Sequence, residues 1–173
     1  MPIAHFLDLG PCSATWDPDT LAVELNPTFG GIRYRDTLLT SPIMEDGQGE
    51  TEIDGVDKGR TVEVEIPMTR FSLQQLEYVI QGSELAADVL AVGNSVGNSF
   101  YALAKEILLK PMVDNALSVI DTQWVHFWHC FPVIDEEIVF DNSEQRVARV
   151  IFKVFPSQST TIGLGQMYQH GTA

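Results

Sequence analysis

The segment from Arg60 to Ile80 constrains the fold more than any other part of the chain. It starts with strict alternation of apolar and acidic side chains, with Val62, Val64 and Ile66 on one side and Glu63 and Glu65 on the other. Such alternation predicts a half-buried β-strand with one apolar face and one acidic face. We expect this strand to close at Pro67, because proline has no N–H to donate to a neighbouring strand.

A short amphipathic helix is predicted directly after this strand. Ser72 is a favoured N-cap residue and Gln75 follows three positions later, which is the spacing of a capping box. Apolar side chains then recur at helical spacing, at Leu73, Leu76, Val79 and Ile80. Gly82 lies where a helix commonly ends. The segment therefore predicts a strand followed by a helix that covers a sheet.

Runs with alternating or β-branched residues predict about eight strands in all. The clearest runs are 12–16, 21–25, 29–40, 123–131, 137–140 and 147–155. Residues 83–98 fit a helix or a strand, and 100–112 is compatible with either period. We expect Pro111 and Pro132 to interrupt strands. This pattern predicts a mainly-β fold, a sandwich or barrel with one flanking α-helix.

The length of 173 residues predicts a single domain spanning residues 1–173. Within it we expect an N-terminal arm over 1–11 and a polar, mobile C-terminal arm over 157–173. The chain does not begin with a basic segment and an apolar run, and no apolar run approaches the roughly 20 residues of a membrane span. We therefore expect a soluble protein, made in a cytoplasm and without a membrane partner.

Residues 41–59 predict a long loop between strands, because they lack a core-building pattern. Loops longer than about 12–15 residues are usually functional or disordered. This one is acidic, with Glu45, Asp46, Glu50, Glu52, Asp54 and Asp57. A solvated linker is the alternative interpretation. Against it, the loop contains four apolar residues that a spacer would not need, namely Ile43, Met44, Ile53 and Val56.

The charge balance makes nucleic-acid binding an unfavourable interpretation. Ten Lys and Arg residues stand against 24 Asp and Glu residues, which gives a net charge of −14. A strongly acidic surface repels phosphates, although such a charge also serves solubility alone. Two cysteines, Cys12 and Cys130, are expected to be buried thiols, with a single bridge possible if their strands meet.

Motifs for catalysis or metal binding are weak. His126 and His129 lie three apart in a predicted strand, so their side chains point to opposite faces and cannot share an ion. Glu63 with Glu65 and the acidic run 135–137 fit a solvated surface better than an acid–base pair. The sequence lacks a phosphate-binding loop and a nucleophile elbow. We therefore expect no enzyme activity, no metal and no cofactor.

Three stretches together resemble the tail tube proteins of tailed bacteriophages. They are MEDGQGETEIDGVDKGRTVEVEIPMTRFSLQQLEYVI (44–80), VLAVGNSVGNSFYALAKEILLKP (89–111) and CFPVIDEEIVFDNSEQRVARVIFKVFPS (130–157). They resemble an acidic loop leading to a strand and helix, a turn followed by a strand ending at proline, and the last two strands of that family. One departure is Cys130-Phe131-Pro132, where that pattern has a small residue.

The resemblance implies a structural virion protein of the phage tail, assembled in the host cytoplasm. Hexameric rings would stack into a hollow tube, with a long non-contractile tail favoured. The tube would conduct DNA during ejection without binding it specifically. Its partners would be further copies of the chain, with tail terminator, tape measure and tail-tip proteins.

The resemblance also gives roles to the acidic segments. Glu63 and Glu65 are expected to face the channel, where a negative wall disfavours adhesion of DNA. The loop over 41–59 is expected to cross to the next ring through its apolar residues. Two alternatives stay open. One is a tail terminator or connector that forms a ring without an extended tube. The other is a monomeric, lipocalin-like barrel that binds a small ligand.

Overall fold

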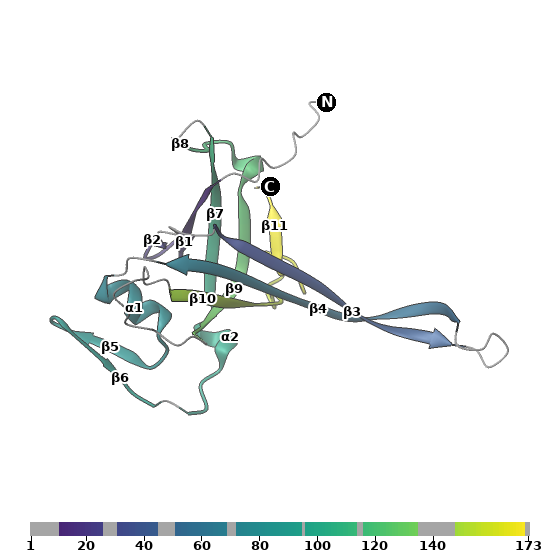
Figure 1. The fold of residues 1–173 in the computed structure, drawn as a ribbon, viewed down its shortest axis with the longest axis horizontal. Helices are drawn as coiled ribbons and strands as arrows, with labels where there is room; N and C mark the ends of the chain where they lie inside the picture. Colours follow the sequence, from purple (N-terminus) through teal and green to yellow (C-terminus); the bar gives the residue numbers. More distant parts are fainter. Residues whose placement is uncertain are drawn as a thin grey trace, which may run out of the picture.

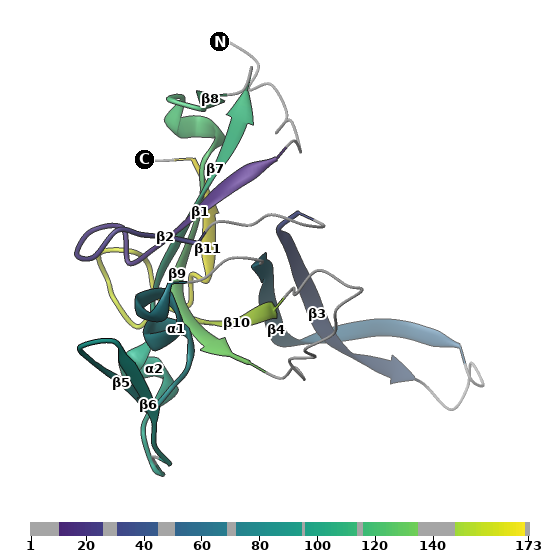
Figure 2. The ribbon, with the colours of Figure 1, turned by 60° about the vertical axis from the view of Figure 1, so that its left-hand side comes forward.

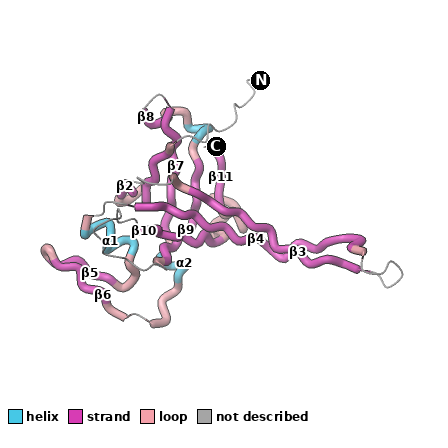
Figure 3. Tube along the Cα trace, in the orientation of Figure 1, coloured by secondary structure: helices cyan, strands magenta, loops and turns pink. Residues whose placement is uncertain are grey.

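The computed structural model describes residues 11–25, 31–44, 51–68, 72–94, 96–113, 116–134 and 148–171. Its strands are β1 (Cys12–Trp16), β2 (Val23–Leu25), β3 (Arg33–Met44), β4 (Glu52–Met68), β5 (Ser83–Ala86), β6 (Val89–Val92), β7 (Lys105–Val113), β8 (Ala116–Leu117), β9 (Val125–Val133), β10 (Ala148–Phe155) and β11 (Tyr168–His170). The helices are α1 (Leu73–Val79), α2 (Phe100–Leu103) and the 3-10 helix η2 (Asp121–Gln123). The predicted mainly-β fold is confirmed (Figure 3), and α2 is a short helix in addition to the predicted one.

One large antiparallel sheet dominates the described chain. Its strand order is β2-β1-β7-β9-β10-β4-β3, and β11 and β8 pair with β9 and β7 outside this path. β7 and β11 run upright in Figure 1 whereas β3 and β4 run across the view, so the sheet is strongly bent. Within the described residues, the path of strands is open, with β2 at one end and β3 at the other.

The bend is located in β9. Its first half pairs with β7 and β11, and its second half pairs with β10. The register with β7 shifts between Ile107↔Phe127 and Lys105↔Cys130, so β9 contains an extra residue at this point. Such a bulge bends a strand and increases its twist. The two halves of the sheet can therefore enclose one core.

The core fills the concave side of this bent sheet. The rings of Trp16 and Phe152 lie 5.2 Å apart between their centroids, and Phe127 and Phe152 are completely buried. Val62, Val64 and Ile66 of β4 point into the same core, as their alternation predicts. These aromatic side chains bury large apolar areas, so they dominate the energy of the core.

Helix α1 closes one end of the core, and its predicted capping box is confirmed. The Gln75 N–H donates to Ser72 Oγ at 3.1 Å, and the Ser72 N–H donates to Gln75 Oε1 at 2.9 Å. Gln75 Nε2 also donates to the carbonyl of Glu24 at 2.6 Å, which ties α1 to β2. Of the four predicted helix residues, Val79 is buried in the core, Leu76 and Ile80 are half-buried, and Leu73 is exposed.

Of the ambiguous residues 83–98, residues 83–92 form a two-stranded hairpin, β5–β6, that is separate from the large sheet. The hairpin is held beside α1 because Glu77 Oε1 accepts from the Leu85 N–H at 3.0 Å. The hairpin projects from the side of the molecule that carries α1 and α2 (Figure 2).

Prolines do not interrupt the strands as predicted. β4 continues through Pro67 to Met68, β7 through Pro111 to Val113, and β9 through Pro132 to Val133. Pro67 pairs with Arg149 of β10, and Pro132 pairs with Phe152 of β10. Within the described residues, neither proline pairs with a strand on its other side. Proline is compatible with a strand where its missing N–H faces no neighbouring strand.

The prediction of a mobile C-terminal arm is wrong for residues 157–171. Ser157 is buried, and its N–H donates to the carbonyl of Gln166 at 2.8 Å. β11 then pairs with β9, and Tyr168 packs against Phe127 with ring centroids 5.6 Å apart. The polar composition was misleading, because β9 offers hydrogen-bonding groups and Phe127 offers apolar surface. The predicted strand 137–140 and residues 1–10 lie outside the described residues.

The two cysteines are free thiols. Cys12 lies on β1 and Cys130 on β9, and β7 separates these strands in the sheet. Burial raises the pKa of the Cys130 thiol well above its usual value, and burial also raises the pKa of Cys12. Because β7 lies between β1 and β9, the possible bridge between Cys12 and Cys130 is not formed in this fold.

Candidate assembly surface

Strands β3 and β4 continue beyond the rest of the sheet as a two-stranded ribbon. Pairing of β4 with β10 ends at Val62↔Val154, whereas pairing of β4 with β3 extends from Thr37↔Thr61 out to Met44↔Glu52. We call residues 37–44 and 52–61 the ribbon; it projects from the body of the molecule in Figures 1 and 2. An isolated two-stranded hairpin is at best marginally stable in water.

The prediction of a loop over 41–59 is therefore wrong for the described part of that range. Residues 41–44 belong to β3 and 52–59 belong to β4. The sequence pattern missed these strands because the ribbon has no buried face, so its pairing imposes no apolar alternation. Gly59 has a φ of 112° beside a register shift at Leu39/Thr40, so it serves an irregularity in the strand pairing.

Large apolar side chains are exposed along the ribbon. Six of them are between 39% and 57% exposed, namely Leu38, Leu39, Ile43, Met44, Ile53 and Val56. They include all four residues predicted to anchor this segment to a neighbour. A monomeric protein rarely exposes apolar side chains in such a concentration, which is typical of an interaction surface.

The ribbon is also acidic toward its far end. Glu52, Asp54 and Asp57 are exposed there, together with a single cation, Lys58. Nearer the body, Arg60 Nη1 lies 3.0 Å from Asp36 Oδ2. Glu45, Asp46 and Glu50, which were assigned to the same acidic segment, lie outside the described residues.

Glu63 and Glu65 lie on the face of β4 opposite the core, as the alternation predicts. Their neighbours were not predicted. In the register of the sheet, Glu63 lies between Arg35 of β3 and Lys153 of β10. Glu65 lies opposite Arg33 of β3, and its Oε1 is 3.7 Å from Nε of Arg149 on β10.

Four cations therefore surround two carboxylates on this part of the sheet. We call Arg33, Arg35, Arg149 and Lys153 with Glu63 and Glu65 the basic face. The four cations are exposed, whereas the two glutamates are half-buried between them. The expected acidic sheet face is thus wrong, because residues from β3 and β10 reverse the sign of the local charge. The alternation within each strand can be read from the sequence, but the sequence does not show which strands lie side by side.

A shallow hollow of about 540 Å³ lies on this face, lined by Arg33, Arg35, Glu63, Glu65 and Ile151 among others. Three of the four cations have no carboxylate within 4 Å among the residues that the structure describes: Arg33, Arg35 and Lys153. These three charges are available to an anionic partner.

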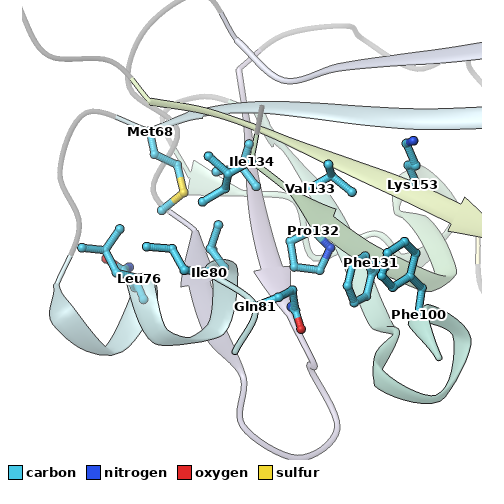
Figure 4. A pocket seen from close by; sticks show the side chains of 13 residues that line it. Met68, Leu76, Ile80, Gln81, Phe100, Phe131, Pro132, Val133, Ile134 and Lys153 are labelled. Atoms are coloured by element: carbon cyan, nitrogen blue, oxygen red, sulfur yellow. The ribbon is translucent and has the colours of Figure 1, made fainter. Parts of the chain in front are cut away.

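An apolar groove of about 530 Å³ adjoins the basic face. Helix α1, strands β9 and β10, and Phe100 of α2 line it (Figure 4). Phe100 stacks on Phe131 with centroids 4.2 Å apart, and this pair forms one wall. Lys153 lines the groove as well as belonging to the basic face, so the two surfaces are continuous.

The two histidines of β9 each contact a different side chain. His126 Nδ1 lies 2.5 Å from Glu106 Oε1, whereas His129 Nε2 lies 3.2 Å from the hydroxyl of Tyr101. Burial lowers the pKa of His129. In the described part of the chain, no three His, Cys, Asp or Glu side chains gather in a way that could hold a metal ion.

Among the described residues, no helix is long and apolar enough to cross a membrane. No protein-family model matches the sequence, and no curated protein matches it.

Proposed function

We propose that this chain is the structural subunit of a phage tail tube. In this proposal six copies form a ring, and rings stack into a hollow tube through which DNA passes. The sequence resemblance to tail tube proteins motivates it, and the mainly-β fold with a helix beside the sheet is compatible with it.

The projecting ribbon is the observation that carries the proposal. A ribbon whose pairing with β10 ends at Val62 gains little stability from its own subunit, yet it exposes six large apolar side chains. A second copy that covers these side chains would remove them from water, at roughly 25 cal/mol per Å² of apolar area buried. Assembly also accounts for the open sheet edges at β2 and β3, which a closed ring can protect.

The basic face makes Glu63 and Glu65 less suited to a non-adhesive channel wall. Glu63 and Glu65 were predicted to line the channel as a non-adhesive surface, and that remains a prediction. With four cations around them, this face would attract phosphates rather than repel them. The proposal requires a tube but does not require that these two glutamates face its channel.

Two rival functions make different predictions. A terminator or connector would also use the ribbon, but it would stop at a single ring. A small-ligand barrel is less well supported, because the described strands form an open path and aromatic rings fill the space that they enclose. Such a binder would have no use for an exposed apolar ribbon.

Electron microscopy of the purified full chain tests the proposal. Filaments with a central channel are the expected result, whereas single rings support the terminator and monomers support the ligand binder. A variant with a shortened ribbon, the truncated-ribbon variant, then tests whether the ribbon joins the subunits. Residues 41–56 are replaced by Asn-Gly, which can close a two-residue turn between the paired residues Thr40 and Asp57.

The truncated-ribbon variant is expected to fold and to form no tubes. Its matched control places the same turn in the other hairpin, as Ala87→Asn with Asp88→Gly between the paired residues Ala86 and Val89. The control is expected to form normal tubes. Tubes from the truncated-ribbon variant would show that the ribbon is not the surface that joins the subunits.

A further inference from the structure

We propose that the acidic, apolar ribbon of one copy docks on the basic face and the adjoining apolar groove of a second copy. This inference rests on the proposed function, because it names the contact that joins the subunits. The occupant is thus a second copy of this chain, identified by the chemistry of its ribbon.

Charge complementarity is the first argument. The protein has a net charge of −14 and only ten Lys and Arg residues, yet four of the ten lie together on the basic face. The ribbon carries Glu52, Asp54 and Asp57 against Lys58 and Arg60, and Arg60 is already paired with Asp36 at the base of the ribbon. Opposite potentials on two surfaces steer them together and fix their register, while like charges suppress other pairings.

Both surfaces also combine charge with apolar area. On the ribbon, Ile43 lies opposite Asp54 in the strand register and Val56 follows Asp54 by two positions, so the three side chains share one face; both apolar side chains are exposed. On the receiving side, Lys153 belongs to the basic face and also lines the apolar groove. A segment that presents both chemistries can therefore engage both surfaces at once.

The contact has to be intermolecular. The ribbon continues the same β3 and β4 strands that carry Arg33, Arg35, Glu63 and Glu65, so it leads away from that face (Figure 1). Docking of one patch on a different patch is a heterologous contact, which generates closed rings or open helical assemblies. In such a contact Glu63 and Glu65 lie between subunits rather than on a free channel wall.

Two charge variants separate the two halves of the contact. The face variant is Arg33→Glu with Arg35→Glu, and the ribbon variant is Asp54→Asn with Asp57→Asn, which introduces no cation that could pair with the reversed face. Each is expected to weaken self-association by at least about tenfold, because close charge pairs across interfaces couple strongly. Sedimentation velocity measures the association, and circular dichroism melting checks that each variant folds.

Mixing the two variants gives the decisive result. The face variant retains an intact ribbon, and the ribbon variant retains an intact basic face. An equal mixture is expected to form 1:1 dimers that do not grow, because one functional contact remains. If the mixture stays monomeric while the unchanged protein associates, the inference is wrong.

The same experiment distinguishes this inference from the proposed function. Dimers in the mixture without tubes from the unchanged protein support the contact and contradict the tail tube. Tubes from the face variant contradict the contact and leave the tail tube supported. A control with exposed residues, Thr160→Glu with Thr161→Glu, makes the protein more acidic away from both surfaces and is expected to associate normally.

A nucleic-acid partner for the basic face is tested in parallel. Fluorescence anisotropy with a labelled 20-mer of single-stranded DNA is measured for the unchanged protein and the face variant. No binding at about 150 mM salt is expected, since the whole molecule is strongly acidic. Binding that disappears in the face variant would overturn the inference and assign the basic face to DNA.

Discussion

The phenol of Tyr168 donates a hydrogen bond of 2.6 Å to Asp36 Oδ2, the same oxygen that lies 3.0 Å from Arg60 Nη1. Tyr168 belongs to the short strand β11 near the C-terminus, whereas Asp36 and Arg60 lie where the ribbon leaves the body. The two segments are separated by 132 positions in the sequence. The C-terminal segment thus helps to fix the base of the ribbon.

Tyr168→Phe is expected to destabilise the fold by about 1 kcal/mol at neutral pH, the usual net value of such a hydrogen bond. The hydrogen bond to Asp36, followed by burial, raises the pKa of Tyr168 above its ordinary value. Its stabilisation is therefore complete below about pH 10, the usual pKa of tyrosine, and is lost as pH rises through the raised pKa.

Thermal melts of both proteins between pH 7 and 11 check this prediction. The difference in melting temperature should be constant below about pH 9 and shrink at higher pH. Tyr78→Phe removes a hydroxyl that accepts a hydrogen bond from Gln74 instead of binding a carboxylate. It serves as the matched control, and an equal pH profile for the two variants would contradict the assignment.

Gln75→Ala is expected to cost more stability than Ser72→Ala. Loss of an N-cap side chain typically costs about 1 kcal/mol. Ser72→Ala removes the hydroxyl that accepts from the Gln75 N–H, whereas Gln75→Ala removes a bond to Ser72 and a second bond to the Glu24 carbonyl. Urea unfolding gives both free energies. Equal values would mean that the tie between α1 and β2 adds nothing.

Substitutions in the core and in the ribbon should affect different properties. Phe152→Ala is expected to cost about 3–5 kcal/mol, because Phe152 is completely buried. Ile43→Ser with Val56→Ser should change the stability of the isolated subunit by less than about 0.5 kcal/mol per site, since both residues are exposed. Urea unfolding measures these costs at a dilution that keeps the chain monomeric.

The ribbon substitutions are nevertheless expected to prevent self-association, which sedimentation velocity measures on the same samples. Thr160→Ala with Thr161→Ala changes exposed residues outside the ribbon and should leave association intact. A stability loss of several kcal/mol in the variant with Ile43→Ser and Val56→Ser would instead show that these side chains support the subunit itself.

The two thiols should differ in reactivity toward a thiol-specific reagent. Cys130 is completely buried and its S–H donates to the carbonyl of Phe127 at 3.4 Å, so it should react only when the protein unfolds. Cys12 is half-buried and should react slowly in the folded state. Cys12→Ser therefore removes the slow phase seen without denaturant. A fast-reacting Cys130 in the folded protein would contradict the position of β9.

Features that depend on residues close together along the chain could be predicted from the amino-acid sequence. Alternation at Val62, Val64 and Ile66 specified a strand with one buried side, and the Ser72–Gln75 spacing specified where α1 begins. Local periodicity and capping leave a direct signature, since the interacting groups lie a few positions apart. The mainly-β class followed from the same kind of pattern.

The surroundings of those elements depend on how distant segments pack together in the fold. Glu63 is acidic in any fold, but the pairing of β4 with β3 and β10 places Arg35 and Lys153 beside it and reverses the charge of the face. The ribbon was likewise invisible, because hydrogen bonds between strands exposed on both faces impose no apolar alternation. Register between distant strands decides both outcomes, and a single strand does not encode the identity of its neighbours.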